Sequence, residues 1–469
     1  MSPEKVKSLV LAGLSGGSGK SVVSVGLIAA LKSHGKGVVP FKKGPDYIDA
    51  GWMTKAAGQP CYNLDPYLMP VEAIATTFQS HLYGNSFAIV EGNRGLFDGV
   101  NASGDYSTAE LALQLDLPVL LVVNCSKATR TVAALVLGCQ AFDPRIRFVG
   151  VILNQIATVR HESIIRQAME RYTDLPVLGI MPRLPQDIFP MRHLGVTPHQ
   201  EYAAADEAVI RLAALAETHF DMDSIVAGMR SVVPIPPLVQ TVRSSSTASL
   251  TIGVLRDAAF QFYYEENLEA LKAAGARLVM IDALNSRELP LDLDGLYIGG
   301  GFPETSARQL ADNASFRQSV RAHIDTGLPV YAECGGLIFL GRSIILNDTE
   351  YPLAGVFPVT FTLSSKPQAH GYSTFTVEKA NSFYPIGTRI KGHEFRYSMV
   401  QQWDGATEDL ALKMERGAGF CGGRDGLVKN NVLALYTHVL ATGTPQWVTG
   451  FIAAARAYAQ QSGKLASTG

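Results

Sequence analysis

One stretch near the start of the chain limits the fold more than any other. Residues 11–31 read LAGLSGGSGKSVVSVGLIAAL, an apolar run that changes into a helical pattern across a glycine-rich turn. Glycines let a backbone turn with positive φ and bring N–H groups close to an anion, and the helix that follows adds its positive N-terminal end. The stretch therefore predicts a strand, a loop and a helix that together bind phosphate.

The spacing of this loop differs by one residue from the common phosphate-binding pattern G-x-x-x-x-G-K-[ST]. Counting back from Gly19, the pattern would place its first glycine at Leu14, but the glycine stands at Gly13. We still expect an ATP site rather than a plain turn with a solvated lysine. Lys20 would neutralise the β- and γ-phosphates, and Ser21 would offer its hydroxyl to Mg²⁺. The residues expected to line the nucleotide are Gly13, Ser15, Gly16, Gly17, Ser18, Gly19, Lys20 and Ser21.

Four acidic residues fit the same site. Glu91 ends the apolar run FAIVEG, where a Mg²⁺ ligand would lie in a nucleotide hydrolase, although a simple strand-end acid is an equally good interpretation. Asp46 and Asp49 in KKGPDYID stand beside Lys42, and this mixture of charges suits an anionic substrate and its metal. Asp98 lies between glycines in GLFDG and by itself indicates a turn.

The first half of the chain alternates apolar runs with helical patterns. Continuous β-branched runs are typical of strands covered on both faces, hence of a parallel sheet. Strands are expected at 8–13, 37–42, 87–92, 118–124, 148–154 and 176–182, and helices at 21–33, 107–115 and 160–172. This order predicts a doubly wound α/β fold that binds ligands at the carboxyl ends of its strands.

A change of composition divides the chain. Residues 232–249, VVPIPPLVQTVRSSSTAS, are rich in proline and serine and are expected to link a domain at 1–231 to a second at 250–469. In the second half the α/β alternation begins again, and later segments such as GVFPVTFTLS and YSTFTVEK favour antiparallel strands. There the expected strands are 250–257, 276–283, 295–301 and 329–334, and the expected helices lie near 263–274 and 308–326.

The charge balance and the cysteines narrow the class of protein. The 469 residues include 40 Lys and Arg against 42 Asp and Glu, which argues against a general nucleic-acid or membrane-surface binder. The five cysteines form no C-x-x-C pair, as expected in a reducing compartment. The first apolar run is too short for a secretory signal, and no stretch approaches about 20 apolar residues. We expect a soluble cytoplasmic protein.

A second site is predicted around Cys334. The segment PVYAECGGLIFLG, residues 329–341, reads as a strand, a cysteine, two glycines and an apolar helix, which is the pattern of a nucleophile elbow. The start of the helix favours the thiolate form, and nearby amides would hold an oxyanion. The alternative is a buried structural cysteine, and the elbow pattern makes it less favoured.

A thiolate nucleophile needs a base. Among ten histidines, His438 in NVLALYTHVLATG follows an apolar strand of the second half and is the natural partner of Cys334, with His370 and His393 as competitors. The glycine-rich segment GLYIGGGFPE, residues 295–304, would supply oxyanion amides or form an ordinary turn.

The two sites together predict one reaction. A thiol that hydrolyses an amide through a thioester releases ammonia, and a kinase-like site that phosphorylates a carboxylate gives ammonia an electrophile to attack. A free carboxylate is a poor electrophile because its leaving group would be oxide. The expected activity is ATP-dependent and glutamine-dependent amidation.

At this point the sequence resembles the cobyrinic acid a,c-diamide synthase family over nearly its whole length. The motifs that carry the resemblance are GLSGGSGKS, PFKKGPDYID, NLDPYLM, EGNRGLFDG, GGGFPE, YAECGGL and the strand before His438. The long loop is similar to that of the dethiobiotin synthetase relatives, which have one extra residue after the first glycine. The resemblance implies a dethiobiotin-synthetase-like P-loop ATPase domain followed by a class I glutamine amidotransferase domain.

The resemblance also implies roles for single residues. Lys20 and Ser21 would bind ATP and Mg²⁺, with Glu91 and Asp46 as metal ligands. Asn154 would read the adenine. Asp46, Tyr47 and Asp98 would lie near the substrate carboxylates, Cys334 would be the glutaminase nucleophile and His438 its base. The substrates would be glutamine and cobyrinic acid, a corrinoid whose a and c acetates become amides by way of acyl phosphates in cobalamin biosynthesis, and a homodimer is plausible.

Two departures from the family pattern stand out. Asn93-Arg94 replaces two apolar residues, which changes the expected substrate contacts. Triad-type glutaminases often carry a glutamate two residues after the histidine, and here that position is Leu440. A cysteine–histidine dyad agrees with the cobyrinate amidases, and it leaves the residue that orients His438 unidentified.

Other functions stay open at this stage. The same double amidation could act on hydrogenobyrinate or nickel-sirohydrochlorin, whereas cobyric acid synthase fits the GPDYID segment less well. A partitioning ATPase of the ParA and MinD type carries a signature lysine where this chain has Ser15, and a regulator would not need both sites intact.

Overall fold

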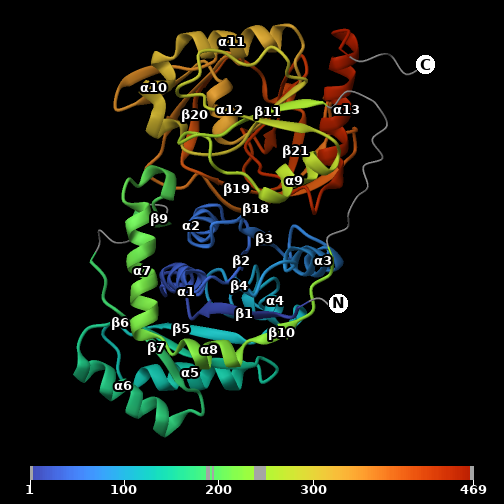
Figure 1. The fold of residues 1–469 in the computed structure, drawn as a ribbon. Helices are drawn as coiled ribbons and strands as arrows, with labels where there is room; N and C mark the ends of the chain where they lie inside the picture. The colour runs from blue at the N-terminus through green and yellow to red at the C-terminus, as the bar shows by residue number, and fades with distance from the viewer. Residues whose placement is uncertain (1–3, 186–190, 193–194, 237–249, 465–469) are drawn as a thin grey trace. The chain divides into compact units, whose positions relative to one another are not determined.

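A computed structural model of the chain describes residues 4–185, 191–192, 195–236 and 250–464. The chain divides into two compact units, Met1–Val239 and Gln240–Gly469, and each is described by itself (Figure 1). Most of the expected linker, residues 237–249, lies outside the described residues, so the boundaries 1–231 and 250–469 stay predictions.

The first unit is built on a mainly parallel sheet with the strand order β3-β2-β4-β1-β5-β6-β7. Strand β10 pairs antiparallel with the first residues of β1, and β8 with β9 forms a separate ribbon. The strands are β1 (Val6–Gly13), β2 (Val38–Lys43), β3 (Tyr62–Leu64), β4 (Phe87–Glu91), β5 (Val119–Asn124), β6 (Phe148–Ile156), β7 (Val177–Pro182), β8 (Met191–Arg192), β9 (Gly195–Val196) and β10 (Arg230–Val232).

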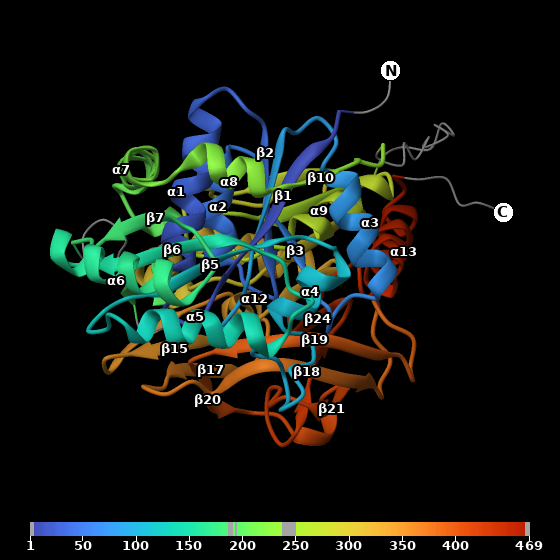
Figure 2. The same cartoon turned by 90° about the horizontal axis from the view of Figure 1, so that it is seen from below.

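Helices lie on both faces of this sheet (Figures 1 and 2). They are α1 (Lys20–Ser33), α2 (Ile48–Ala57), α3 (Val71–His81), α4 (Thr108–Gln114), α5 (Thr131–Phe142), α6 (Val159–Tyr172), α7 (Ala205–His219), α8 (Met222–Gly228) and the short η1 (His199–Glu201). Alternate strand residues such as Leu9 and Leu11 join one core with Val23 of α1 and Leu212 of α7. This two-sided burial explains why the strands read as continuous apolar runs.

The predicted doubly wound fold of this unit is confirmed. All six predicted strands are present, with ends that shift by about one or two residues. The prediction omitted β3 and β10, because three residues are too few to show a period.

The second unit contains a six-stranded sheet with the order β12-β11-β13-β14-β24-β23, in which only the edge strand β23 is antiparallel. Its strands are β11 (Thr251–Leu255), β12 (Arg277–Ile281), β13 (Gly295–Ile298), β14 (Val330–Glu333), β23 (Leu427–Lys429) and β24 (Val432–Leu435). Two smaller sheets have four strands each. The first contains β15 (Ser343–Leu346), β16 (Thr349–Pro352), β17 (Val359–Leu363) and β20 (Ser398–Trp403). The second contains β18 (Ala369–Val377), β19 (Arg389–Arg396), β21 (Leu412–Arg416) and β22 (Arg424–Asp425).

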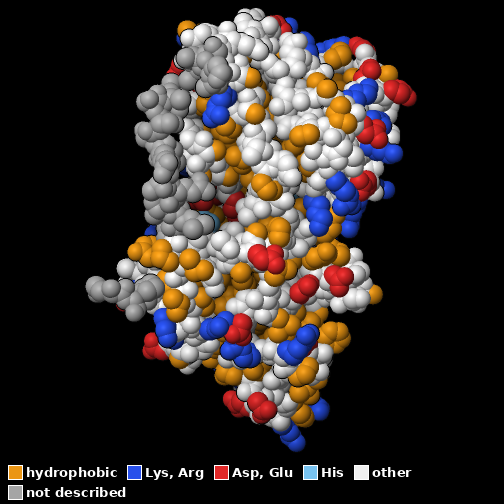
Figure 3. Space-filling model, turned by 90° about the vertical axis from the view of Figure 1, so that its right-hand side faces the viewer, with side chains coloured by type: hydrophobic (Ala, Val, Ile, Leu, Met, Phe, Trp, Pro, Cys, Tyr) orange, Lys and Arg blue, Asp and Glu red, His pale blue; other side chains and the backbone are white. Residues whose placement is uncertain are grey.

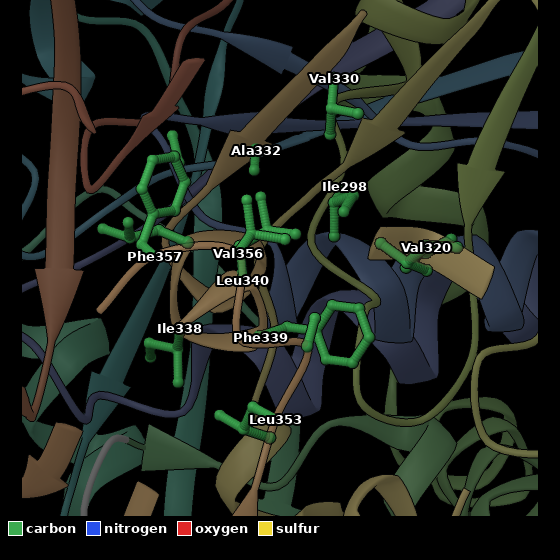
Figure 4. Close-up of a cluster of buried hydrophobic side chains, with 14 of the residues drawn as sticks. Ile298, Val320, Val330, Ala332, Ile338, Phe339, Leu340, Leu353, Val356 and Phe357 are labelled. Carbon is green, nitrogen blue, oxygen red and sulfur yellow. The ribbon is translucent and has the colours of Figure 1, made fainter. Parts of the chain in front are cut away.

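Two cores cover the faces of the six-stranded sheet. The helices are α9 (Glu265–Ala273), α10 (Ala307–Asp312), α11 (Ala314–Asp325), α12 (Gly335–Leu340) and α13 (Pro445–Gln461), with the short η2 (Pro303–Ser306) and η3 (Thr407–Asp409). Along β14, Val330 and Ala332 pack with α11 and α12, whereas Tyr331 packs with α13. Figure 4 shows the first of these cores, with Ile338, Phe339 and Leu340 of α12 among its side chains.

One predicted helix is divided in the structure. The sequence indicated a single helix near 308–326, but α10 ends at Asp312 and α11 begins at Ala314. The side chain of Asn313 between them accepts a hydrogen bond from Phe316 N at 3.4 Å. Asparagine is a preferred N-cap residue, and it starts a new helix here at the point where the predicted helix would have continued.

The distribution of surface charge and the length of the helices can also be described. On the face drawn in Figure 3, basic and acidic side chains are interspersed. Within the described ranges, every helix is too short or too polar to cross a lipid bilayer.

Candidate functional sites

The phosphate loop of the first unit connects the end of β1 to the start of α1. A Cβ on Gly13 would lie 2.8 Å from Ser18 Cβ, so the two ends of the loop touch at a point where only glycine fits. Ser18 Oγ donates to Ser15 O at 2.9 Å and accepts from Ser15 N at 3.1 Å. Gly16 and Gly17 are exposed at the tip, and Gly19 has a φ of 92°. Ser18 therefore closes the longer loop, which explains the displaced glycine.

Lys20 is buried under this loop. Its Nζ donates to Ser15 O at 3.1 Å and to Arg94 O at 2.7 Å. Burial, together with repulsion from Lys42, lowers the pKa of Lys20 to about 8. Neutral carbonyl oxygens of Ser15 and Arg94 leave the charge of Lys20 poorly neutralised, so the site favours an anionic ligand.

A second lysine, Lys42 at the end of β2, links two buried acids. Its Nζ donates to Asp49 Oδ2 and to Glu91 Oε1, both at 2.8 Å. Ser21 Oγ donates to Glu91 Oε1 at 3.1 Å, and the Ser24 hydroxyl donates to the other oxygen of Glu91. Burial alone would lower the pKa of Lys42, but the charges of Asp49 and Glu91 outweigh it and raise that pKa well above its usual value.

The two aspartates after β2 differ in environment. Burial and the charge of Asp49 raise the pKa of Asp46 to about 7, and Asp46 Oδ1 accepts from Asp49 N at 2.9 Å. Burial would raise the pKa of Asp49 as well, but Lys42 outweighs it and the pKa of Asp49 is lowered. Hydrogen bonds with Ser21 and Glu91 contribute to the same lowering, which places Asp49 beside these two residues.

These oxygens are the donors that Mg²⁺ prefers. Ser21, Asp49 and Glu91 offer one hydroxyl and two carboxylates around a shared position, and Mg²⁺ typically takes one or two carboxylates together with water and phosphate oxygens. Among the described residues, no group of three or more His, Cys, Asp or Glu side chains is placed to hold a metal ion. A Mg²⁺ held here would therefore need ligands from outside this set, such as the Ser21 hydroxyl and the phosphate oxygens of a nucleotide.

Three further predicted residues lie around this site. Tyr47 is half-buried just before α2. Asp98 is exposed, and its Oδ2 accepts from Gly95 N at 2.8 Å. Its charge slightly opposes the lowering of the Lys20 pKa that burial causes. Asn154 Nδ2 donates to Ser18 O at 2.9 Å, so this side chain braces the phosphate loop, and its role as an adenine reader stays a prediction.

In the second unit, β14 leads into α12 through Cys334. The backbone of Cys334 has a φ of 48° and a ψ of −97°, a conformation that costs about 1–3 kcal/mol in a residue other than glycine. Its N–H donates to Leu435 O at 2.8 Å on β24. A Cβ on Gly335 would lie 3.0 Å from Gly301 N, so an amide of the GGGFPE segment lies beside the turn. The strain and the nearby amide agree with the predicted elbow.

His438 lies within hydrogen-bond reach of this cysteine. Burial would lower the pKa of His438, but hydrogen bonds with Cys334 and Glu333 and the charges of both outweigh it and raise the pKa to about 10. His393 stacks on His438 with ring centroids 4.9 Å apart, and its Nδ1 lies 3.1 Å from Tyr264 OH. His370 is exposed on β18. Of the three candidate histidines, His438 is the one that contacts Cys334.

Sequence reasoning assigned no role to several residues that the structure places in these sites. Asp49 and Lys42 were noted as charges, but their contacts with Glu91 depend on how β2 and β4 pair. Ser24 lies one turn along α1 from Ser21, a spacing that the sequence does show. Glu333, the acid next to Cys334, was passed over, although an acid at the end of a buried strand is itself a signal.

Comparisons with known proteins agree with both units. Residues 9–194 match the CobQ/CobB/MinD/ParA nucleotide binding domain, and residues 251–446 match the CobB/CobQ-like glutamine amidotransferase domain. The chain is 40% identical over 451 residues to a cobyrinate a,c-diamide synthase of Magnetococcus marinus, covering 95% of this chain and 96% of that protein. The enzymes of the same name from Archaeoglobus fulgidus and Dehalococcoides mccartyi are 38% and 37% identical, covering 93% and 95% of this chain and 95% and 97% of theirs.

Proposed function

The chain belongs to the cobyrinate a,c-diamide synthase family, and from this premise we propose that it converts the a and c acetates of cobyrinic acid to amides with ATP and glutamine. The observation that carries the proposal is the presence of both predicted sites in a chain that is 40% identical to a cobyrinate a,c-diamide synthase over nearly its full length. The nucleotide-binding half has a buried lysine under a glycine loop, and the amidotransferase half has a cysteine in contact with a histidine.

We propose that the first unit activates the carboxylate. The loop amides and Lys20 hold the phosphates of ATP, and the carbonyl contacts of Lys20 give way to phosphate oxygens. An oxygen of the substrate carboxylate attacks the γ-phosphorus, the bond to ADP breaks, and an acyl phosphate forms. Ser21, Asp49 and Glu91 would hold Mg²⁺, with Asp46 as a further candidate. A Mg²⁺ held by these residues would neutralise the negative charge that develops on the phosphate oxygens.

We propose that the substrate acetates bind near Asp46, Tyr47 and Asp98. A carboxylate would be repelled by two ionised aspartates, but the pKa of Asp46, raised to about 7 by burial and by Asp49, lets its carboxyl act as a hydrogen-bond donor near neutral pH. Tyr47 is half-buried next to it and offers a hydroxyl.

In the second unit, the Cys334 thiolate attacks the side-chain amide of glutamine. His438 receives the thiol proton and returns it to the leaving nitrogen, so ammonia departs and a thioester remains, which water hydrolyses to glutamate. The amides of Gly301 and Gly335, which lie close together at the elbow, are suited to hold the oxyanion.

Mass spectrometry of the products tests the proposed substrate. The full chain is incubated with ATP, Mg²⁺ and glutamine, and with cobyrinic acid, hydrogenobyrinic acid or nickel-sirohydrochlorin in separate reactions. We expect two acid-to-amide exchanges on cobyrinic acid, at a lower substrate concentration than either of the other two tetrapyrroles requires. Faster double amidation of either other tetrapyrrole would replace the proposed substrate, and amidation of none would overturn the proposal. The homodimer stays a prediction, and sedimentation equilibrium would test it by measuring the molar mass in solution.

A further inference from the structure

Glu333 occupies an unusual place for an acid. It is the last residue of β14, adjacent to Cys334 in sequence, and its side chain is fully buried. Because side chains alternate along a strand, Glu333 points to the same face as Tyr331, away from the core that contains Ala332. A buried carboxylate is costly unless it is paired, so its contacts indicate what it does.

The carboxylate of Glu333 holds both the ring and the backbone of the His438 segment. Its Oε2 lies 3.3 Å from His438 Nδ1, and its Oε1 accepts from Val439 N at 3.2 Å. Tyr297 OH donates to the same Oε2 at 3.3 Å. The position two residues after His438, Leu440, is buried and apolar and offers no side-chain acceptor.

These contacts determine the tautomer of His438. The Glu333 carboxylate accepts hydrogen bonds from Tyr297 OH and Val439 N, so it acts as an acceptor toward His438 as well, and the neutral imidazole carries its proton on Nδ1. Nε2 then carries the lone pair, and His438 also contacts Cys334. Gly300 leaves room for this ring, because a Cβ at that position would collide with His438.

We propose that Glu333 is the positioning residue of the glutaminase centre: its carboxylate keeps the Nδ1–H tautomer of His438 and stabilises the imidazolium that forms when Cys334 loses its proton. The inference rests on the proposed function in taking Cys334 as the glutaminase nucleophile. A purely structural role would instead use the carboxylate to satisfy Val439 N and Tyr297 OH.

The other titratable groups near His438 define what a pH measurement reports. His393 stacks against the ring from β19, and burial together with the charge of His438 holds its pKa well below the usual value, so it stays neutral. The groups that face His438 directly or through one contact are Cys334, Glu333, His393, Tyr297, Tyr264 and His370. Of these, Glu333 is the acid that touches the ring.

Alkylation of Cys334 separates the two roles. The full chain is treated with iodoacetamide between pH 5 and about 10, and peptide mass spectrometry follows Cys334 apart from the other cysteines. In Glu333→Gln the neutral amide still offers an acceptor to Val439 N, but the negative charge is gone. We expect the midpoint of the pH profile of Cys334 alkylation to rise by about one unit.

Two variants serve as controls. Tyr297→Phe removes a hydrogen bond from the same Oε2 and keeps the charge, so we expect a smaller shift than in Glu333→Gln. Glu333→Asp keeps the charge on a shorter side chain, and we expect it to restore part of the wild-type profile. If Glu333→Gln does not fold, as judged by thermal unfolding, the profile of Glu333→Asp must still differ from that of the wild type.

A folded Glu333→Gln with the wild-type alkylation profile would overturn the inference, as would a shift in Tyr297→Phe as large as that in Glu333→Gln. Alkylation needs neither ATP nor a corrinoid. A wild-type chain that fails to amidate any tetrapyrrole therefore contradicts the proposed function, whereas an unchanged alkylation profile in a chain that does amidate contradicts the role of Glu333 alone.

Discussion

The two sites differ in what completes them. In the first unit, Lys42 donates hydrogen bonds to Asp49 and Glu91, whereas Lys20 donates to backbone carbonyl oxygens. Within the described part of the chain, the positive charge of Lys20 has no carboxylate in hydrogen-bond contact, and a bound anion would neutralise it. In the second unit, a nucleophile, a base and a carboxylate already contact one another within a single protein framework. Nucleotide sites store unpaired charge, and a hydrolytic dyad can be complete before its substrate arrives.

The two sites also shift the pKa of their central cationic residue in opposite directions. Burial lowers the pKa of a lysine that has no hydrogen bond to a carboxylate, and this is the case for Lys20. A histidine between a thiol and a carboxylate has the opposite response, and the pKa of His438 is raised. The contrast between the sites can therefore be tested through substitutions and through pH.

Removing Lys20 should have the largest effect. In Lys20→Ala the cation under the phosphate loop is lost, and we expect amidation to fall by about a thousandfold with either glutamine or ammonia as nitrogen source. Steady-state rates with both sources measure this. Lys32→Ala, an exposed lysine on the same helix, is the matched control. Amidation at the wild-type rate in Lys20→Ala would contradict the assignment of the ATP site.

Removing Lys42 tests whether the first site is incomplete without a ligand. In Lys42→Met two buried carboxylates lose their counter-ion, and we expect the first unit to lose about 3–5 kcal/mol of stability. Adding ATP with Mg²⁺ should raise the Tm of the variant, measured by thermal unfolding, more than that of the wild type. The reason is that Mg²⁺ would replace the missing Lys42 ammonium as the counter-ion of Asp49 and Glu91. Equal stabilisation in both would show that Lys42 does not occupy a cation position.

A pH series should separate the sites without any substitution. Burial and Lys42 lower the pKa of Lys20 to about 8, so its charge is present below pH 8 and is lost above it. The dissociation constant of ATP should rise by up to about tenfold per unit above pH 8. Glutamine hydrolysis should stay level from pH 8 to 9, since the pKa of His438, raised by Cys334 and Glu333, is about 10. Parallel loss of both would indicate a common titrating group.

The smallest effect is expected at Asp98. Its carboxylate caps Gly95 N and lies on an exposed turn near the Lys20 site, so Asp98→Ala should slow amidation several-fold and leave glutamine hydrolysis unchanged. Asp98→Asn keeps the cap and separates the charge from the turn. If Asp98→Ala alters neither the rate nor the ratio of mono- to diamide, this residue has no part in substrate binding.

The sequence predicted the features that depend on near neighbours. The strands, the phosphate loop and the elbow each arise from short patterns, and the resemblance to dethiobiotin synthetase relatives accounted for the position of Gly13. The partners of Glu91 and His438 depend on strand pairing instead: Lys42 meets Glu91 because β2 pairs with β4, and Glu333 meets His438 across 105 residues because β14 pairs with β24. A local pattern carries no record of such contacts.

Asp49 illustrates the same limit on a smaller scale. The motif GPDYID contains two aspartates three residues apart; the prediction took Asp46 as a metal ligand, which stays a prediction, and gave Asp49 no separate role. The structure brings Asp49 to Ser21 and Glu91, because α2 begins at Ile48 and turns that side chain toward β4. Which acid faces a site depends on where a helix starts, and that start is uncertain by a residue or two in any sequence-based prediction.

The separation of the two sites is tested most directly by following ¹⁵N into the products of Cys334→Ser. The full-length variant is incubated with cobyrinic acid, ATP and Mg²⁺, once with amide-labelled glutamine and once with labelled ammonium. We expect labelled diamide from ammonium and none from glutamine. Labelled product from glutamine, or no product from either source in a folded variant that still binds ATP, would contradict the separation.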